Sequence, residues 1–149
     1  MKISIQVEDF DIGAETALLR RNNSDTGAIV TFTGLVRDSE KGRHIESLTL
    51  EHYPGMTESS LEKILAQAQS RWPVLDITVI HRVGELKVGE QIVFVAVVSE
   101  HRQAAFEASE FIMDYLKTRA PFWKKCRDES GESWVEAKAS DMQASERWR

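Results

Sequence analysis

The stretch QIVFVAVVSEHRQAAFEASEFIMDYLKTRA, residues 91–120, joins a strand pattern directly to a helix pattern. Residues 91–99 are apolar on both faces, which is typical of a central strand that is covered on both sides. From about Ser99 to Ala120, apolar residues recur at the i, i+3, i+4, i+7 and i+8 positions counted from Ala108, which predicts the longest helix of the chain. The stretch therefore predicts a helix packed on a sheet whose central strand is buried.

Shorter patterns predict the remaining strands. Alternating or β-branched runs occur at residues 2–7, 27–34, 45–53, 76–84 and 132–138. Each of these runs is typical of a strand. Between them, residues 37–44 are expected to form a charged loop and residues 85–90 a turn.

Two further helices and a weakly helical tail complete the pattern. A short helix is predicted at residues 14–21, and a longer one ends before Pro73. The longer helix begins either with Thr57 as its cap or with a capping box of Ser59 and Glu62. The order β-α-β-β-α-β-β-α-β predicts a single α+β domain over residues 1–149, with a mixed sheet and packed helices.

Composition narrows the class of protein. The chain has 149 residues, 42% hydrophobic and 29% charged, as is ordinary for a globular domain. No apolar run reaches the roughly 20 residues of a membrane span, and the N-terminus does not read as a signal peptide, so we expect a cytoplasmic protein. Cys126 is the only cysteine, which excludes an internal disulfide and a CxxC metal site. The net charge of -5 argues against bulk nucleic-acid binding.

The end of the long helix carries the first candidate site. Lys117 and Lys124 lie on either side of Pro121, whose ring should end the helix near Ala120. The two amines could complement the helix dipole, or they could converge on one anion. The apolar segment around Phe122 favours the second reading, because a partly dehydrated lysine has a lowered pKa and can act as a nucleophile or base.

Two other segments could bind an anion. His101 and Arg102 lie where the central strand meets the N-terminus of the long helix, whose free N–H groups attract negative charge. Arg37 follows a strand in a loop that contains Gly34. Each segment is also compatible with an ordinary solvent-exposed turn. His52 and His81 fall in strand patterns and are interpreted as structural, and Cys126 is interpreted as incidental.

Five blocks taken together carry a family resemblance. They are GAIVTFTGLVRD (27–38), LTLEHYPGMTE (48–58), VIHRVGEL (79–86), SEHRQAAFEASEFIMDYLKTRAPFWKK (99–125) and WVEAK (134–138). In this order and spacing they resemble the catalytic (large) subunit of molybdopterin synthase. The resemblance implies an α/β hammerhead-type α+β fold. It also implies a sulfurtransferase that forms the dithiolene of molybdopterin in molybdenum cofactor biosynthesis.

The same resemblance implies the substrates and the assembly. The sulfur acceptor would be cyclic pyranopterin monophosphate. The donor would be a C-terminal Gly-Gly thiocarboxylate on a small ubiquitin-like partner subunit. Two large subunits would form a central homodimer with one small subunit at each end, a heterotetramer. Neither a metal nor a cofactor is implied, because both substrates bring their own reacting groups.

Site residues follow position by position from the family motifs. Lys117 and Lys124 are implied as catalytic, with Lys117 central as an electrostatic, acid–base or acyl-forming group. The other implied substrate-binding positions are Leu35, Val36, Arg37, His101, Arg102, Lys125 and Cys126. Arg37, His101 and Arg102 would bind the phosphate. Leu35 stands where the family often has a lysine, and Cys126 where it usually has a glutamate.

Two other functions remain open on the sequence. A non-catalytic adaptor could dock a ubiquitin-like protein without needing Lys117. A sensor of a phosphate ligand would need Arg37 and Arg102 but no protein partner.

Overall fold

The stretch at residues 91–99 lies inside a four-stranded sheet, as its apolar pattern predicts. The structure, a computed structural model, describes residues 1–40, 42–135 and 139–149. Strand order in this first sheet is β1 (Lys2–Gln6), β6 (Val74–Arg82), β8 (Gln91–Ser99) and β2 (Ala28–Leu35). Only β1 and β6 are parallel, and the other neighbours are antiparallel. The predicted mixed sheet of an α+β fold is therefore confirmed.

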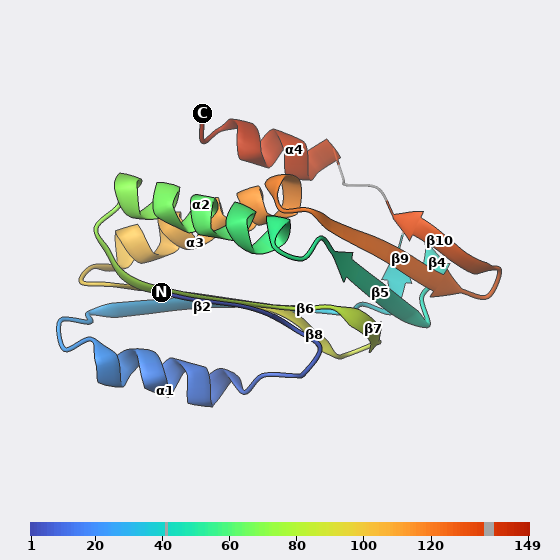
Figure 1. The fold of residues 1–149 in the computed structure, drawn as a ribbon, viewed down its shortest axis with the longest axis horizontal. Coiled ribbons are helices and arrows are strands. Elements are labelled where there is room, and N and C mark those ends of the chain that lie inside the picture. The colour runs from blue at the N-terminus through green and yellow to red at the C-terminus, as the bar shows by residue number, and fades with distance from the viewer. Residues whose placement is uncertain (41, 136–138) are drawn as a thin grey trace.

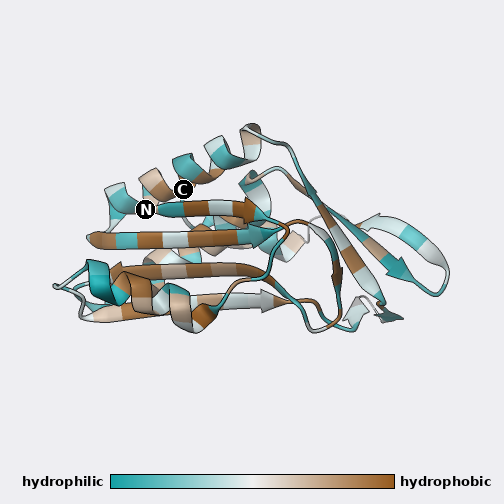
Figure 2. Cartoon of the chain, turned by 60° about the horizontal axis from the view of Figure 1, so that its bottom comes forward, coloured by the Kyte–Doolittle hydropathy of each residue, from teal (hydrophilic) through white to brown (hydrophobic). Residues whose placement is uncertain are grey.

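Helices cover both faces of this sheet (Figure 1). Helix α1 (Ile12–Asn22) lies on one face, and α2 (Met56–Arg71) and α3 (Arg102–Arg119) lie on the other, with α4 (Ala139–Glu146) beyond them. Figure 2 shows apolar residues running along the strands of the first sheet. Because neighbouring residues of a strand point to opposite faces, Val79 joins the core under α2 and α3 while Ile80 joins the core with Leu19 of α1. None of the described helices is both long enough and apolar enough to cross a membrane.

The long helix begins and ends close to its predicted limits. Its first helical residue is Arg102, because His101 is extended at φ -126° and ψ 149°. Its last is Arg119, because Ala120 is extended at φ -87° and ψ 133° ahead of Pro121. Proline disfavours helical backbone in the residue before it, so the predicted end of the helix is confirmed.

A second four-stranded sheet stands at one end of the molecule, to the right in Figure 1. Its order is β10 (Gly131–Val135), β9 (Phe122–Asp128), β5 (Ser47–His52) and β7 (Gly84–Lys87), and all its pairs are antiparallel. The predicted turn at residues 85–90 is therefore wrong in its first half, which forms most of β7. The segment after Pro121 is a full strand, which local patterns did not predict, because its partners β5 and β10 are supplied by other parts of the chain.

The predicted loop at residues 37–44 contains a small hairpin of its own. It pairs β3 (Ser39–Glu40) with β4 (Arg43–His44). The predicted strand at residues 132–138 is confirmed as far as Val135, and residues 136–138 lie outside the described residues. The weakly helical tail is helix α4, which is followed by Trp148.

Helix α2 starts earlier than either predicted cap allows. Gly55 is its cap, at a φ of 84° that glycine adopts without steric cost. The Glu58 carboxylate accepts a hydrogen bond from the Gly55 amide. The capping box at Ser59 and Glu62 is therefore wrong. Thr57 lies one residue inside the helix and is fully buried, so it is not the cap either.

Candidate active site

Lys117 lies in the last turn of α3 and is solvent-exposed. Met113, four residues before it on α3, packs against the core under α2 and α3. Residues at this spacing share one face of a helix, so the Lys117 stem leaves α3 beside the face that packs against this core. The amine is therefore carried by a rigid element and remains open to solvent.

The ring of Phe122 connects the end of α3 to the first sheet. It stacks on the imidazole of His81 in β6, with ring centroids 3.8 Å apart and planes 15° from parallel. The turn before Phe122 is held by Thr57, whose hydroxyl donates to the Pro121 carbonyl at 3.1 Å and accepts from the Tyr53 amide at 2.9 Å. These contacts set where β9 begins.

Lys124 and Lys125 lie on opposite faces of β9. Lys124 shares a face with Phe122, two residues before it, and is half-buried. Lys125 points to the other face, where its amine lies 4.7 Å from the centre of the Trp134 ring and 3.7 Å from a Glu132 carboxylate oxygen. Lys117, Lys124, His81 and Phe122 are called the lysine site below. Lys125 stands outside it.

Cys126 is the site residue that the structure places furthest from the predicted role. Its side chain is fully buried and packs in a core with Leu48, Leu50 and Leu86. It lies two residues after Lys124 on the same face of β9, and Val36 and Ile45 belong to the same buried cluster. A group buried in this way offers no surface to a substrate, so Cys126 supports the strand from within.

The loop of Arg37 lies at the same end of the first sheet as His81. Gly34 pairs with Val93, and His81 pairs with Val93 from the other side, so β2 and β6 end together. Arg37 and Leu35 are exposed there. The Val36 side chain is buried, its amide donates to Glu90 at 3.0 Å and its carbonyl accepts from Gly89 at 2.9 Å. Val36 is therefore a structural support of this loop.

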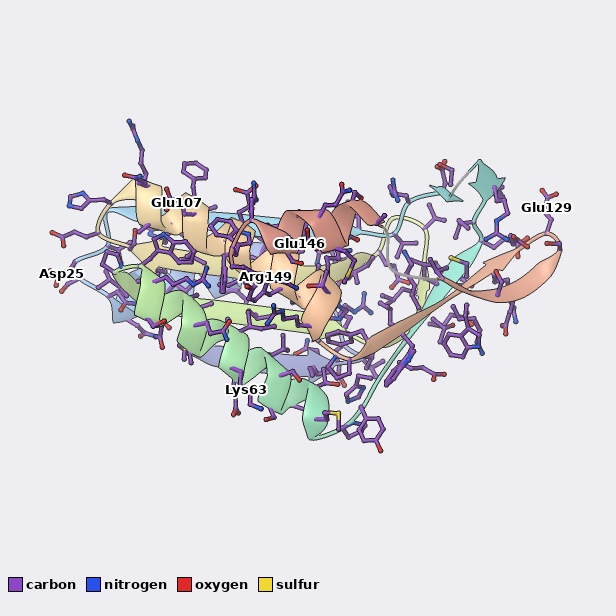
Figure 3. The ribbon with its side chains drawn as sticks, turned by 90° about the horizontal axis from the view of Figure 1, so that it is seen from above. Asp25, Lys63, Glu107, Glu129, Glu146 and Arg149 are labelled. Carbon is purple, nitrogen blue, oxygen red and sulfur yellow. The ribbon has the colours of Figure 1, made fainter. Side chains whose placement is uncertain are left out.

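His101 and Arg102 lie at the opposite end of the molecule from the lysine site. Strand β8 ends at Ser99, which pairs with Ala28 at the start of β2. Lys117 follows Arg102 by fifteen residues of one helix, which at about 1.5 Å per residue separates them by about 22 Å along its axis. In Figure 3, Glu107 marks the half of α3 that contains Arg102. One chain therefore does not bring the predicted phosphate-binding residues together.

The electrostatics of the lysine site centre on His81. Burial lowers the pKa of this imidazole from 6.5 to about 4, against the hydrogen bond to the Arg82 carbonyl, which raises it. The charges of Lys117 and then of His52 lower the pKa further. At neutral pH the imidazole is therefore uncharged.

The sequence did not reveal the roles of two residues: His81 in the lysine site, and Thr57, which bonds the Pro121 carbonyl just outside it. His81 was interpreted only as structural and Thr57 only as a possible cap. The sequence contained one indication for His81. It shares a face of β6 with Ile77 and Val79, where another aliphatic residue would be expected in the core. Among the described residues, no three His, Cys, Asp or Glu side chains are grouped so as to hold a metal ion.

The fold and the site define a class of protein, an α+β domain that binds anionic ligands through exposed cations at the ends of its helices and strands. The sequence model of the MoaE protein family matches residues 5–119, and the chain belongs to this family. It is 54% identical over 147 residues to the molybdopterin synthase catalytic subunit of Escherichia coli. The matched region covers 99% of this chain and 97% of that protein.

Solved structures are similar over nearly the whole chain. The molybdopterin biosynthesis MoaE protein from Burkholderia ambifaria is 51% identical, with a TM-score of 0.84, over 99% of this chain and 98% of that one. A complex of subunits 1 and 2 of molybdopterin-converting factor from Helicobacter pylori contains a chain with a TM-score of 0.73 and 21% identity, over 92% of this chain and 90% of that one. This second likeness shows a shared fold.

Proposed function

We propose that this chain is the catalytic subunit of a molybdopterin synthase, a sulfurtransferase. It would move sulfur from the C-terminal thiocarboxylate of a small ubiquitin-like subunit to cyclic pyranopterin monophosphate, and so form the dithiolene of molybdopterin. The observation that carries the proposal is the 54% identity, over 99% of the chain, to a molybdopterin synthase catalytic subunit. The lysine site supports it, because both substrates are anions.

Lys117 is assigned the central role at the donor's tail. Its ammonium, exposed at the end of a rigid helix, can attract the thiocarboxylate and stabilise the negative charge that develops at the acyl carbon. The same amine could serve as an acid–base group or form a transient acyl link. Lys124, two residues after Phe122, would position the precursor or the half-sulfurated intermediate.

The partner is proposed from two observations. The neighbour from Helicobacter pylori is a complex of two subunits of molybdopterin-converting factor. In this chain Trp123 follows Phe122 directly, and its exposed ring lies 6.3 Å from the exposed ring of Tyr53, on the face of β9 opposite to that of Lys124. We propose that these rings contact the folded body of the partner, while its C-terminal anion reaches Lys117.

The separation along α3 supports a homodimer. A ligand the size of a pyranopterin cannot contact Arg102 and Lys117 of one chain when they are about 22 Å apart along the helix. We propose that His101 and Arg102 of one protomer complete the lysine site of the other and bind the phosphate there. Arg37, at the lysine end of the first sheet, would act from the same chain as Lys117. The assembly with one small subunit at each end is then a heterotetramer.

Lys117→Ala tests the function directly. We expect nearly complete loss of dithiolene formation when the variant is mixed with thiocarboxylated partner and precursor, because the charge at the acyl carbon loses its stabilising cation. The measurement is single-turnover conversion of the precursor, with partner binding followed by sedimentation. Lys63→Ala, on the outer side of α2 in Figure 3, is the matched control and should keep the wild-type rate.

The result separates the alternatives. A wild-type rate in Lys117→Ala would remove Lys117 from catalysis. A wild-type chain that binds the partner but never converts the precursor would be an adaptor. A chain that binds only the phosphate compound would be a sensor. We also propose that residues 1–149 form one domain and that the protein is cytoplasmic.

A further inference from the structure

Strand β6 carries a histidine where its pattern calls for an aliphatic residue. Ile77 and Val79 point towards α2 and α3 and are fully buried in the core there. His81 is the next residue on that face and is only 5% exposed. Burying an imidazole costs free energy that a valine or isoleucine would not cost. This cost is offset only where both ring nitrogens have hydrogen-bonding partners.

The structure fixes which nitrogen of His81 carries the proton. Nδ1 lies 2.8 Å from the backbone carbonyl oxygen of Arg82. A carbonyl can only accept, so Nδ1 of the neutral ring must be the donor. The other nitrogen, Nε2, then has a lone pair and can only accept. His81 is thus an acceptor whose orientation is set by its own strand.

The ring cannot turn freely, because Phe122 stacks on it at 3.8 Å. The ionisable groups that act on it come from two other elements: Lys117 from α3 and His52 from β5, opposite Phe122 in the sheet register. The Arg82 side chain points to the other face of β6, where it donates to the carbonyls of Val7 and Gln91. His52 has its own acidic neighbour, since its Nε2 lies 3.8 Å from a Glu58 carboxylate oxygen. Of the two groups, Lys117 is therefore the better candidate to donate a hydrogen bond to Nε2 of His81.

We propose that His81 is a positioning residue for Lys117, and that its unprotonated Nε2 holds the Lys117 ammonium at the end of α3. This role deepens the proposed function, since Lys117 is the group assigned to the donor's tail. A neutral imidazole attracts the ammonium, whereas a charged one would repel it. Phe122 fixes the acceptor, and Thr57 fixes Phe122 through Pro121. The amine that meets the tail is thus oriented by a chain of contacts that reaches into the core.

The first test needs no enzyme assay. Nitrogen NMR of the wild-type chain reports the His81 tautomer, and we expect the proton on Nδ1 at neutral pH. Carbon NMR of the Lys117 side chain, assigned with Lys117→Arg, follows the titration of its amine. In His81→Phe, which keeps an aromatic ring but has no acceptor, the midpoint of that titration should move to lower pH by about half a unit, because the ammonium loses its acceptor.

Two further variants separate positioning from mere support. His81→Gln restores a neutral acceptor and should return the midpoint towards the wild-type value. Ile80→Val removes a methylene from the opposite face of β6 and should leave the Lys117 titration unchanged while weakening the core. A His81 proton on Nε2, or the same Lys117 midpoint in wild type and His81→Phe, would overturn the proposal. If His81→Phe does not fold, a proton on Nε2 of the wild-type ring would still overturn the proposal.

The sulfur-transfer reaction supplies an independent measurement. If Lys117 works as an ammonium, the alkaline limb of the pH–rate profile should move to lower pH in His81→Phe by the same amount as the NMR midpoint. A purely structural role would lower the rate at every pH without moving the limb. A wild-type complex that forms no dithiolene would refute the proposed function, yet the Lys117 titration would still test the role of His81.

Discussion

At the scale of single residues, the candidate site is decided by which face of a strand each side chain occupies. Lys124 and Lys125 are neighbours in sequence, yet only Lys124 faces the lysine site, because successive strand residues alternate. The same alternation buries Cys126. The sequence does not show this, since it predicts that the helix ends near Ala120 but carries no local strand pattern after Pro121. Lys117 could be placed from sequence because helical periodicity is a local property.

The buried imidazole of His81 makes stability depend on pH. Its pKa is about 4 in the folded chain and 6.5 when unfolded, so between these values the unfolded chain binds a proton that the folded chain does not. Stability therefore falls as pH drops from about 6.5 to about 4, by about 3 kcal/mol in total. Hydrogen bonds from Gln91 and Ser130 keep the pKa values of Asp9 and Asp128 below 3.8. Those two carboxylates therefore lose their contribution at lower pH.

Urea unfolding at about pH 7 and at about pH 4.5 measures this slope. In His81→Phe the loss of stability between the two pH values should shrink by about 2 kcal/mol, because no imidazole is left to protonate at this position. His44→Asn, at an exposed histidine of β4, should behave as wild type. Equal slopes in His81→Phe and wild type would contradict a buried neutral His81.

At the scale of elements, the sequence predicts what is local and misses what is paired at long range. The helices and the four strands of the first sheet carry clear periodicity, and all were predicted with modest errors at their ends. The second sheet was only half predicted, because β9, which follows Pro121, has charged residues at four of its seven positions, and β7 is four residues long. These strands exist because β5 and β10 pair with them.

The junction between α2, α3 and β9 depends on one buried hydroxyl. Thr57 hydrogen-bonds both Pro121 and Tyr53, residues 64 and four positions away in the chain. Thr57→Val keeps the shape but leaves a carbonyl and an amide unsatisfied, so we expect a loss of about 1–3 kcal/mol in the free energy of unfolding. The measurement is urea unfolding with tryptophan fluorescence.

Thr16→Val is the matched control, because the Thr16 hydroxyl bonds only within its own helix, to Ile12 at 2.7 Å, and is exposed. It should change the free energy of unfolding by no more than about 0.5 kcal/mol. If both threonine variants lose the same small amount, the Thr57 hydroxyl does not hold the start of β9.

At the scale of the whole molecule, the two groups of predicted site residues lie at opposite ends of the fold. Helix α3 carries Arg102 at its start and Lys117 at its end, and the first sheet beneath it separates the same two ends by about 27 Å along β8. The sequence predicts the elements that carry Arg102 and Lys117. It does not predict how two residues so far apart could belong to one site, which is what the family resemblance implies. In the proposed homodimer, a second copy of the chain would bring its Arg102 to the Lys117 of the first.

Mixed dimers test that dependence. Arg102→Ala and Lys117→Ala should each be nearly inactive alone, the first through weak binding of the phosphate. If each site combines Lys117 of one protomer with Arg102 of its partner, a mixed dimer keeps one intact site. Unfolding and refolding the two variants together should then restore about a quarter of wild-type activity, since half of the dimers are mixed and each has one working site of two.

The control for this experiment is refolding each variant by itself, which should restore nothing. A double variant, Arg102→Ala with Lys117→Ala, refolded with wild type gives the converse test of whether the two residues act across the interface or within one chain. Its mixed dimers have no intact site if the residues act across the interface, and one intact site if they act within a chain. Sedimentation at micromolar concentration must show a dimer throughout. A monomer, or two single variants that fail to complement each other, would return Arg102 to a site of its own, about 22 Å from Lys117 along the same helix.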